Sequence, residues 1–192
     1  INKISRDLQN KIKGKVLSDP FSRGRYSTDS SLYQITPLGA VLPKDQNDVL
    51  NLMEYSQKNS IPLLARGGGS SQCGQTVNEA IVLDYSMHQN KILDLNLEEK
   101  YVWVQPGIVL DSLNKYLKPH GLWFPVDVST SSRATIGGMT GNNSCGSRSL
   151  YYGNMVNNVL AVEAILDDGS IHTFEDIDKN YLQATNDQNR QY

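Results

Sequence analysis

The chain has few of the residues on which metal centres and disulfide frameworks depend. Its 192 residues include two cysteines, Cys73 and Cys145, and three histidines, His88, His120 and His172. No Cys-x-x-Cys pair occurs, so this chain alone has too few thiolates for an iron–sulfur cluster or a structural zinc site. The scattered histidines do not have the spacing of metal ligands. The sequence does not exclude a single disulfide between the two cysteines.

A strong net charge and long apolar runs are also missing. The formal net charge is −2, which gives no basic field to attract nucleic acid or an anionic membrane surface. No apolar stretch approaches the ~18 residues that span a bilayer, and no signal peptide is visible. We therefore expect no transmembrane segment, and a location in the cytoplasm or at the inner face of a membrane. Because the chain starts at Ile1 and ends in a polar tail, we also expect a domain of a larger protein.

Three successive glycines, Gly67–Gly69, are the most informative feature that is present. They follow one apolar run, Ile61–Ala65, and precede another, Ala80–Leu83, so two strands are expected to flank a glycine-rich loop. Glycine permits positive φ and removes the Cβ atoms that would keep a ligand away from the backbone. Successive N–H groups in such a loop can converge on an anion, most often a phosphate. The loop is therefore predicted to bind phosphate.

Two familiar phosphate-binding loops do not fit this segment. Gly69 and Gly74 have the glycine spacing of a P-loop, but Gln75 stands where the lysine belongs, and a strand rather than a helix is expected next. The dinucleotide pattern G-x-G-x-x-G fails because Gln72 occupies the third glycine position. A flexible surface loop without a ligand remains the alternative.

The elements around the loop predict an α/β arrangement in the first half of the chain. Apolar residues at every fourth position predict an N-terminal helix that Pro20 ends: Ile4, Leu8, Ile12 and Val16. Residues 25–29 are expected to form a polar turn. A strand over Leu38–Pro43 precedes a helix capped by Asp45, with these residues on one face: Val49, Leu52, Met53 and Ser56. From residue 38 to residue 83, the expected order of elements is therefore strand, helix, strand, loop and strand.

The second half reads as antiparallel strands with one longer helix. Alternating patterns predict a meander through Lys91–Leu95 and Tyr101–Gln105. Helical spacing follows at Val109, Leu110, Leu113 and Leu117. The turn Asp167–Ser170 is expected to join two strands, Val159–Leu166 and Ile171–Phe174, in a hairpin.

Small and hydroxyl-bearing residues dominate a second unusual segment, Val126–Gly146. Such a segment lets backbone lie against a flat polar molecule. Thr135 is predicted to cap a short helix from Gly137 and to aim N–H groups at a phosphate. The alternative is a tightly packed, loop-rich layer without a ligand. Two separate backbone-exposing segments together favour a large cofactor.

Five segments in this order resemble the FAD-binding (PCMH-type) domain of the vanillyl-alcohol oxidase superfamily: Tyr26–Asp29, Arg66–Gln75, Pro125–Gly146, Tyr152–Gly153 and Val159–Gly169. The similarity is greatest to the branch with D-lactate dehydrogenases, D-2-hydroxyglutarate dehydrogenases and the glycolate oxidase flavin subunit. The stretch TIGGMTGNNSCGSRSLYYG is especially similar to long members that carry an iron–sulfur domain on the same polypeptide.

This resemblance implies an α+β fold of two α/β subdomains. A small parallel-strand lobe over about residues 1–85 would precede a mostly antiparallel lobe over about residues 86–192, and the cap domain that binds substrate would lie outside the chain. The implied reaction is FAD-dependent oxidation of a D-2-hydroxy acid, of the D-lactate, D-2-hydroxyglutarate or glycolate type, to the 2-oxo acid. Electrons would pass to a quinone, a cytochrome or an iron–sulfur domain rather than to NAD.

The resemblance also implies that catalytic residues and any iron–sulfur cluster lie outside this chain. The catalytic base would lie in the cap, so no catalytic residue is assigned in this chain and the fragment alone is expected to be inactive. Any iron–sulfur cluster would lie outside it. The alternatives are a flavin reductase of the UDP-N-acetylenolpyruvoylglucosamine type and a non-redox nucleotide-binding module.

The family places the FAD pyrophosphate at the glycine loop, which implies the following ligands: Arg66, Gly67, Gly68, Gly69, Ser70, Ser71 and Gln72, with Gly74 and Gln75 adjoining. The ribityl chain and isoalloxazine would pass Pro125, Asp127, Thr130, Ser131, Gly137, Gly138, Gly141, Asn142 and Gly146. Gly153 and Val159 would approach the adenosine half. Relatives with covalent FAD usually have a histidine just after the glycines, where this chain has serines, so non-covalent FAD is expected. Cys73 is interpreted as a small packing residue.

Overall fold

The protein is described from a computed structural model, which covers residues 2–175 in its described part, with side chains from residue 4 onward. The chain divides into two compact units, Ile1–Asn158 and Val159–Tyr192. Each unit is described by itself. The subdomain boundary expected near residue 85 remains a prediction.

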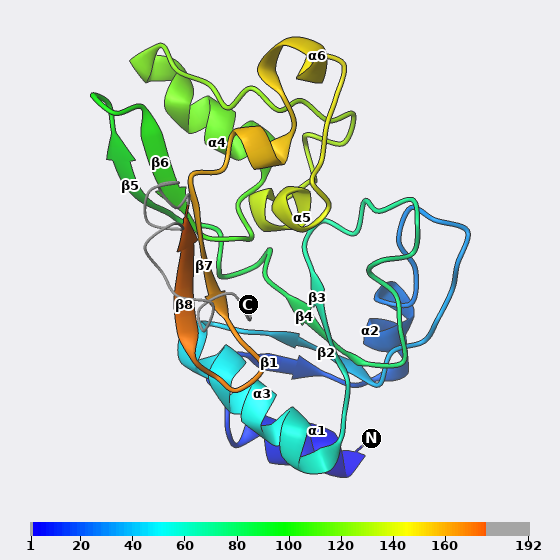
Figure 1. The fold of residues 1–192 in the computed structure, drawn as a ribbon. Coiled ribbons are helices and arrows are strands. Elements are labelled where there is room, and N and C mark those ends of the chain that lie inside the picture. The colour runs from blue at the N-terminus through cyan, green and yellow to red at the C-terminus, as the bar shows by residue number, and fades with distance from the viewer. Residues whose placement is uncertain (1, 176–192) are drawn as a thin grey trace, which may run out of the picture. The chain divides into compact units, whose positions relative to one another are not determined.

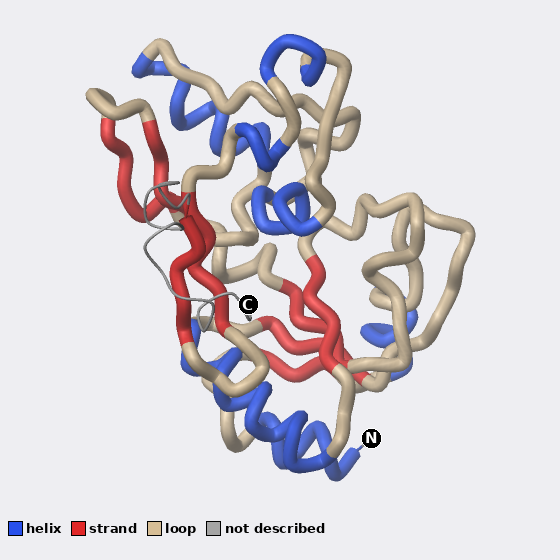
Figure 2. Tube along the Cα trace, in the orientation of Figure 1, coloured by secondary structure: helices blue, strands red, loops and turns tan. Residues whose placement is uncertain are grey.

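A four-stranded sheet organises the first half of the first unit (Figures 1 and 2). Its strands are β1 (Lys15–Leu17), β2 (Gly39–Leu42), β3 (Leu63–Arg66) and β4 (Ile81–Asp84), in the order β1-β2-β4-β3. β4 runs parallel to both β2 and β3, while β1 is antiparallel to β2. β2 and β4 are buried along their whole length, as expected for parallel strands covered on both faces. The predicted parallel-strand lobe is confirmed.

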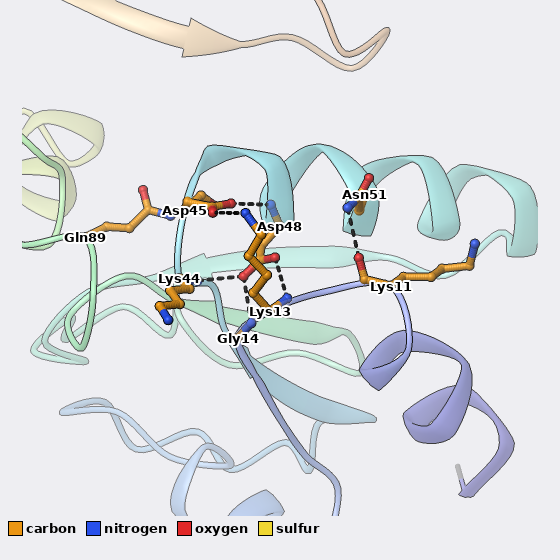
Figure 3. Close-up of polar contacts among 8 residues, drawn as sticks. All are labelled: Lys11, Lys13, Gly14, Lys44, Asp45, Asp48, Asn51 and Gln89. Carbon is orange, nitrogen blue, oxygen red and sulfur yellow. Dashed lines mark hydrogen bonds and ion pairs between the residues drawn. The ribbon is translucent and has the colours of Figure 1, made fainter.

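Three helices accompany this sheet: α1 (Asn2–Gln9), α2 (Pro20–Arg25) and α3 (Gln46–Asn59). The side chain of Asp45 accepts a hydrogen bond from the backbone N–H of Asp48, so the predicted N-cap of α3 is confirmed. On the predicted face, Val49, Leu52 and Ser56 are buried, and Met53 is half-buried. Asn51 of α3 donates to the carbonyl of Lys11, just beyond α1, at 2.9 Å (Figure 3).

The N-terminal prediction was wrong in two respects. The helix ends at Gln9 instead of extending to Val16, which lies in β1. Pro20 begins α2 rather than ending a helix, because Asp19 caps the helix and proline at its first position needs no N–H. Leu8 and Ile12 are both buried, as their spacing indicated, but Ile12 lies in the loop after the helix.

Asp48 explains why the chain leaves the helix before β1 (Figure 3). Its side chain is 1% exposed, and its carboxylate accepts three backbone N–H groups: Lys13 at 2.7 Å, Gly14 at 2.8 Å and Lys44 at 2.8 Å. The N–H groups of residues 13 and 14 are therefore satisfied by a side chain of α3. A helix continuing through residues 13 and 14 would forfeit these two bonds and leave the buried carboxylate with the Lys44 N–H as its remaining partner among the three.

The rest of the first unit follows the predicted meander and helix. β5 (Ile92–Asn96) and β6 (Tyr101–Val104) pair antiparallel, and α4 (Leu110–Leu117) packs on them through a core around Ile108 and Leu113. Four short helical segments follow: η1 (Lys118–His120), α5 (Ile136–Gly141), α6 (Ser149–Tyr152) and η2 (Met155–Asn157).

In the second unit, β7 (Ala161–Ile165) and β8 (Ile171–Glu175) form the expected antiparallel hairpin. Within residues 2–175, no helix combines the length and apolar character needed to cross a bilayer. Cys73 and Cys145 are both exposed free thiols, so no disulfide joins them.

Candidate cofactor-binding site

The glycine loop leaves β3 at Arg66 and presents a row of free donors. None of the backbone N–H groups from Gly67 to Gln72 donates a hydrogen bond to another part of the described chain. Gly69 has φ of +64°, which bends the loop in a way that side-chain-bearing residues rarely adopt. Consecutive, unpaired N–H groups at a bend are the elements of a backbone anion site. The predicted phosphate-binding chemistry is therefore available at this loop.

The two segments predicted to bind the cofactor lie against each other. A Cβ atom on Gly67 would collide with the Thr135 hydroxyl, and one on Gly68 would collide with the Arg133 carbonyl. At the far end of the loop, the Gln75 amide donates to the Asn142 side-chain oxygen at 3.2 Å. Figure 1 shows α5 close to the end of β3, where the loop begins. The glycines are thus needed for close packing of the second segment as well as for access to their backbone.

Thr135 caps α5 as predicted, but the helix does not aim free N–H groups at a ligand. Thr135 is 2% exposed, and its hydroxyl accepts from the Gly138 N–H at 3.3 Å. The N–H of Ile136 donates to the Ile108 carbonyl at 2.9 Å, and that of Gly137 to the Pro106 carbonyl at 2.8 Å. Protein acceptors therefore occupy the first-turn donors of α5. The sequence could not reveal this, because the acceptors come from the distant residues 106–108.

Asp127 holds the end of the second segment together. Its carboxylate accepts from the Ser147 hydroxyl at 2.7 Å and from the Arg148 N–H at 3.1 Å. A Cβ atom on Gly146 would collide with the Asp127 carbonyl, so Gly146 is needed for this close approach. These hydrogen bonds, the one from Ser147 first, hold the pKa of Asp127 below its usual range. Asp127 and Gly146, both predicted to lie along the flavin, pack against each other, and these contacts of Asp127 are with the protein.

The remaining predicted residues occupy turns and helix ends. Thr130 and Ser131 lie in a turn. This turn is hydrogen-bonded to the N-terminus of α4, where the Asp111 N–H donates to the Ser131 carbonyl at 3.2 Å. Space around Gly141 is open, with no atom within 4 Å of a Cβ built there. Gly153 follows α6 with φ of +78°. Of the other predicted site residues, Ser70, Ser71 and Pro125 are half-buried and lie in loops. Gln72 and Asn142 are exposed. Val159 is the first residue of the second unit.

Arg66, which was predicted to belong to the backbone donors of the loop, uses its side chain for contacts within the protein. Its guanidinium donates to the Thr28 carbonyl at 2.8 Å and to the Thr76 carbonyl at 3.2 Å, and lies 5.5 Å from the centre of the Tyr26 ring. Burial, as the largest cause, lowers the pKa of Arg66. Residues 26–29, interpreted from sequence as a turn, are therefore part of the loop's surroundings.

Four residues near the loop were not among the predicted site residues: Tyr26, Asp29, Tyr33 and Asp84. The Tyr26 hydroxyl donates to Asp84 at 2.7 Å, and the Thr76 hydroxyl donates to Asp29 at 3.0 Å. A Cβ atom on Gly74, which has φ of +75°, would lie 2.6 Å from the Tyr33 ring. The only available signal was the placement of Tyr26–Asp29 within the family resemblance. Among residues 2–175, no group of three or more histidine, cysteine or acidic side chains could hold a metal ion.

Comparison with known proteins finds dehydrogenases among the relatives of this chain. Over 172 residues the chain is 42% identical to the D-2-hydroxyglutarate dehydrogenase of Haemophilus influenzae, covering 86% of this chain and 16% of that protein. The corresponding enzyme of Escherichia coli is 39% identical over 174 residues, with 89% and 17% covered. The chain thus spans about one sixth of the length of these curated relatives.

The fold is also shared with solved structures. An alkyldihydroxyacetonephosphate synthase matches with a TM-score of 0.76 at 22% identity, over 95% of this chain and 36% of that one. This confirms the predicted PCMH-type α+β fold. Residues 37–175 match the family described as "FAD binding domain". The chain therefore belongs to this family of FAD-binding domains.

Proposed function

We propose that this chain is the FAD-binding part of a dehydrogenase that oxidises a D-2-hydroxy acid to the 2-oxo acid. The observation that carries the proposal is the 42% identity to D-2-hydroxyglutarate dehydrogenase over 86% of the chain. D-2-hydroxyglutarate is therefore the first substrate to test, and D-lactate and glycolate are the next. Bound FAD supplies the hydride acceptor for such an oxidation.

The chain's own residues would bind and orient this cofactor. We assign the pyrophosphate to the N–H groups of Gly67–Gln72, which have no acceptor in the part of the chain that the structure describes, because a doubly charged anion needs several converging donors. The flavin end would lie along the second segment, where the open space at Gly141 leaves the backbone accessible. Since Thr135 and Asp127 are engaged within the protein, we assign them to shaping this segment.

Proton abstraction would fall to residues outside this chain. His88, His120 and His172 are all exposed and come from three different parts of the sequence, so they offer no paired base. We place the base and the substrate carboxylate ligands in a cap domain. Electrons would leave to a quinone, a cytochrome or an iron–sulfur domain, and the enzyme would act in the cytoplasm or at the inner face of a membrane.

The decisive experiment is anaerobic reduction of the flavin in the intact protein. D-2-Hydroxyglutarate should bleach the oxidised flavin absorbance, whereas the L-enantiomer should not. Bleaching by D-lactate or glycolate alone would move the proposal to those substrates. Bleaching by NADPH alone would favour the reductase alternative. Protection against heat by ADP but not FAD would overturn flavin binding altogether.

A further inference from the structure

We infer that Arg66 is a positioning residue that fastens the glycine loop to a clasp, defined as the segment Tyr26–Tyr33, and does not bind the pyrophosphate itself. This inference rests on the proposed position of the FAD pyrophosphate at Gly67–Gln72. It assigns a role to the guanidinium of Arg66, a residue predicted only among the backbone donors of the loop. It also gives a function to a segment that lies outside the predicted ligand set.

Arg66 ties together three parts of the chain. It is the last residue of β3, and the loop begins directly after it. One guanidinium nitrogen donates to the Thr28 carbonyl in the clasp at 2.8 Å, and the other donates to the Thr76 carbonyl, where the loop ends, at 3.2 Å. The side chain therefore spans the two ends of the loop. The planar fork of arginine is suited to holding two acceptors at once.

Two more contacts hold the clasp to the loop. The Thr76 hydroxyl donates to Asp29 at 3.0 Å, beside the Arg66 bond to the Thr76 carbonyl. The Tyr33 ring packs against Gly74, near the end of the loop. The clasp thus touches the loop at its start and near its end. Movement of the loop away from β3 would break all of these contacts.

The clasp itself is anchored in the core. Tyr26 is 6% exposed and donates to Asp84, the residue paired with Arg66 between β3 and β4. Ser27 is buried, and its carbonyl accepts from the Ile35 N–H at 2.9 Å. An isolated antiparallel bridge pairs Thr28 of the clasp with Gln34, the residue that follows the clasp. A rigid support of this kind can fix the loop before any ligand arrives.

The charges around Arg66 argue against a role as an anion ligand. Asp29 and Asp84 both interact electrostatically with the guanidinium, so two carboxylates face one cation. A pyrophosphate approaching Arg66 would also approach these carboxylates. The backbone donors of the loop have no such competition. We therefore assign anion binding to the backbone and preorganisation to Arg66, since a loop already held in shape loses less entropy on binding.

Charge-conserving substitution separates the two roles. Arg66→Lys keeps the charge but cannot reach both carbonyls, so it should weaken FAD binding by about tenfold, as much as Arg66→Met does. Thr76→Val should weaken binding similarly, while Thr76→Ser, which keeps the hydroxyl, should bind like the wild type. The ratios of these Kd values to that of the wild type should not change with salt. If Arg66→Lys binds normally, and Arg66→Met loses affinity only at low salt, the positioning role is overturned.

A matched control and a cofactor-free measurement keep the inference separate from the proposed function. Arg23 also donates to a backbone carbonyl, that of Pro37 at 2.7 Å, outside the clasp. Arg23→Lys should therefore leave FAD affinity unchanged. In cofactor-free intact protein, proteinase K should cut within residues 67–76 faster in Arg66→Lys than in the wild type or Arg23→Lys. Equal cutting would overturn the clasp, whereas a wild-type protein that binds no FAD would overturn the proposed function instead.

Discussion

At the scale of single residues, Asp48 is the side chain on which the first unit depends most clearly. It accepts three backbone N–H groups from two separate loops (Figure 3). Asp48→Ala would leave these donors unpaired, so we expect the free energy of unfolding to fall by about 3 kcal/mol. Urea denaturation measures this. Asn51→Ala, which removes one exposed bond to the Lys11 carbonyl, is the control and should change stability by no more than about 0.5 kcal/mol.

Gly68 carries a second prediction at this scale. Gly68→Ala would place a methyl group against the Arg133 carbonyl, which is backbone and cannot rotate away. We expect the two cofactor-binding segments to be pushed apart, with a loss of about 1–3 kcal/mol in stability. Gly24→Ala is the control, because nothing lies within 4 Å of a Cβ atom there. Equal melting temperatures for Gly68→Ala and the wild type would show that the segments are not in close contact.

At the scale of elements, α5 depends on one cap. Thr135→Val keeps the size and branching of the buried side chain but removes the oxygen that accepts from the Gly138 N–H. The expected loss is about 1 kcal/mol of stability, measured by thermal unfolding. Thr135→Ser restores the oxygen and should recover most of the loss. A Val variant as stable as the wild type would mean that the cap contributes nothing.

The elements also show which sequence signals were sufficient. Buried β2 and β4 were found from short apolar runs, and the starts of α3 and α5 from their capping residues. The N-terminal helix was drawn too long because its spacing was read without the acceptors that residues 13 and 14 find on Asp48. Pro20 was read as a stop signal, although Asp19 before it makes it a helix start. In both cases the helix boundary depends on hydrogen bonds to a nearby aspartate rather than on the spacing of apolar residues.

At the scale of the whole molecule, stability should fall in acid. Among residues 4–175, six carboxyl groups have folded-state pKa values below their ordinary range: Asp19, Asp29, Asp45, Glu54, Asp127 and Asp168. At Asp29, burial is the largest single cause and raises the pKa, but the hydrogen bonds from Ser31 and Thr76 together lower it. The folded protein therefore binds fewer protons than the unfolded chain as the pH falls below about 4.

The stabilisation from these carboxylates is fully present above their unfolded pKa values and is lost as the pH falls through the folded ones. Urea midpoints should consequently drop between about pH 5 and about pH 3. Asp29→Asn removes one titrating group and should make this dependence shallower. A midpoint that is constant across the range would contradict the low pKa values.

The sequence by itself determined most of the elements after residue 37, the family and the glycine loop, because these depend on local signals: apolar runs, capping residues and glycines in succession. Tertiary structure decided how the site is built. Contacts between distant residues occupy the first-turn donors of α5 and engage Arg66 with carbonyls at Thr28 and Thr76, while the N–H groups of Gly67–Gln72 find no acceptor within residues 2–175. Whether a backbone donor is available depends on where its nearest acceptor lies in space, and sequence spacing does not contain that information.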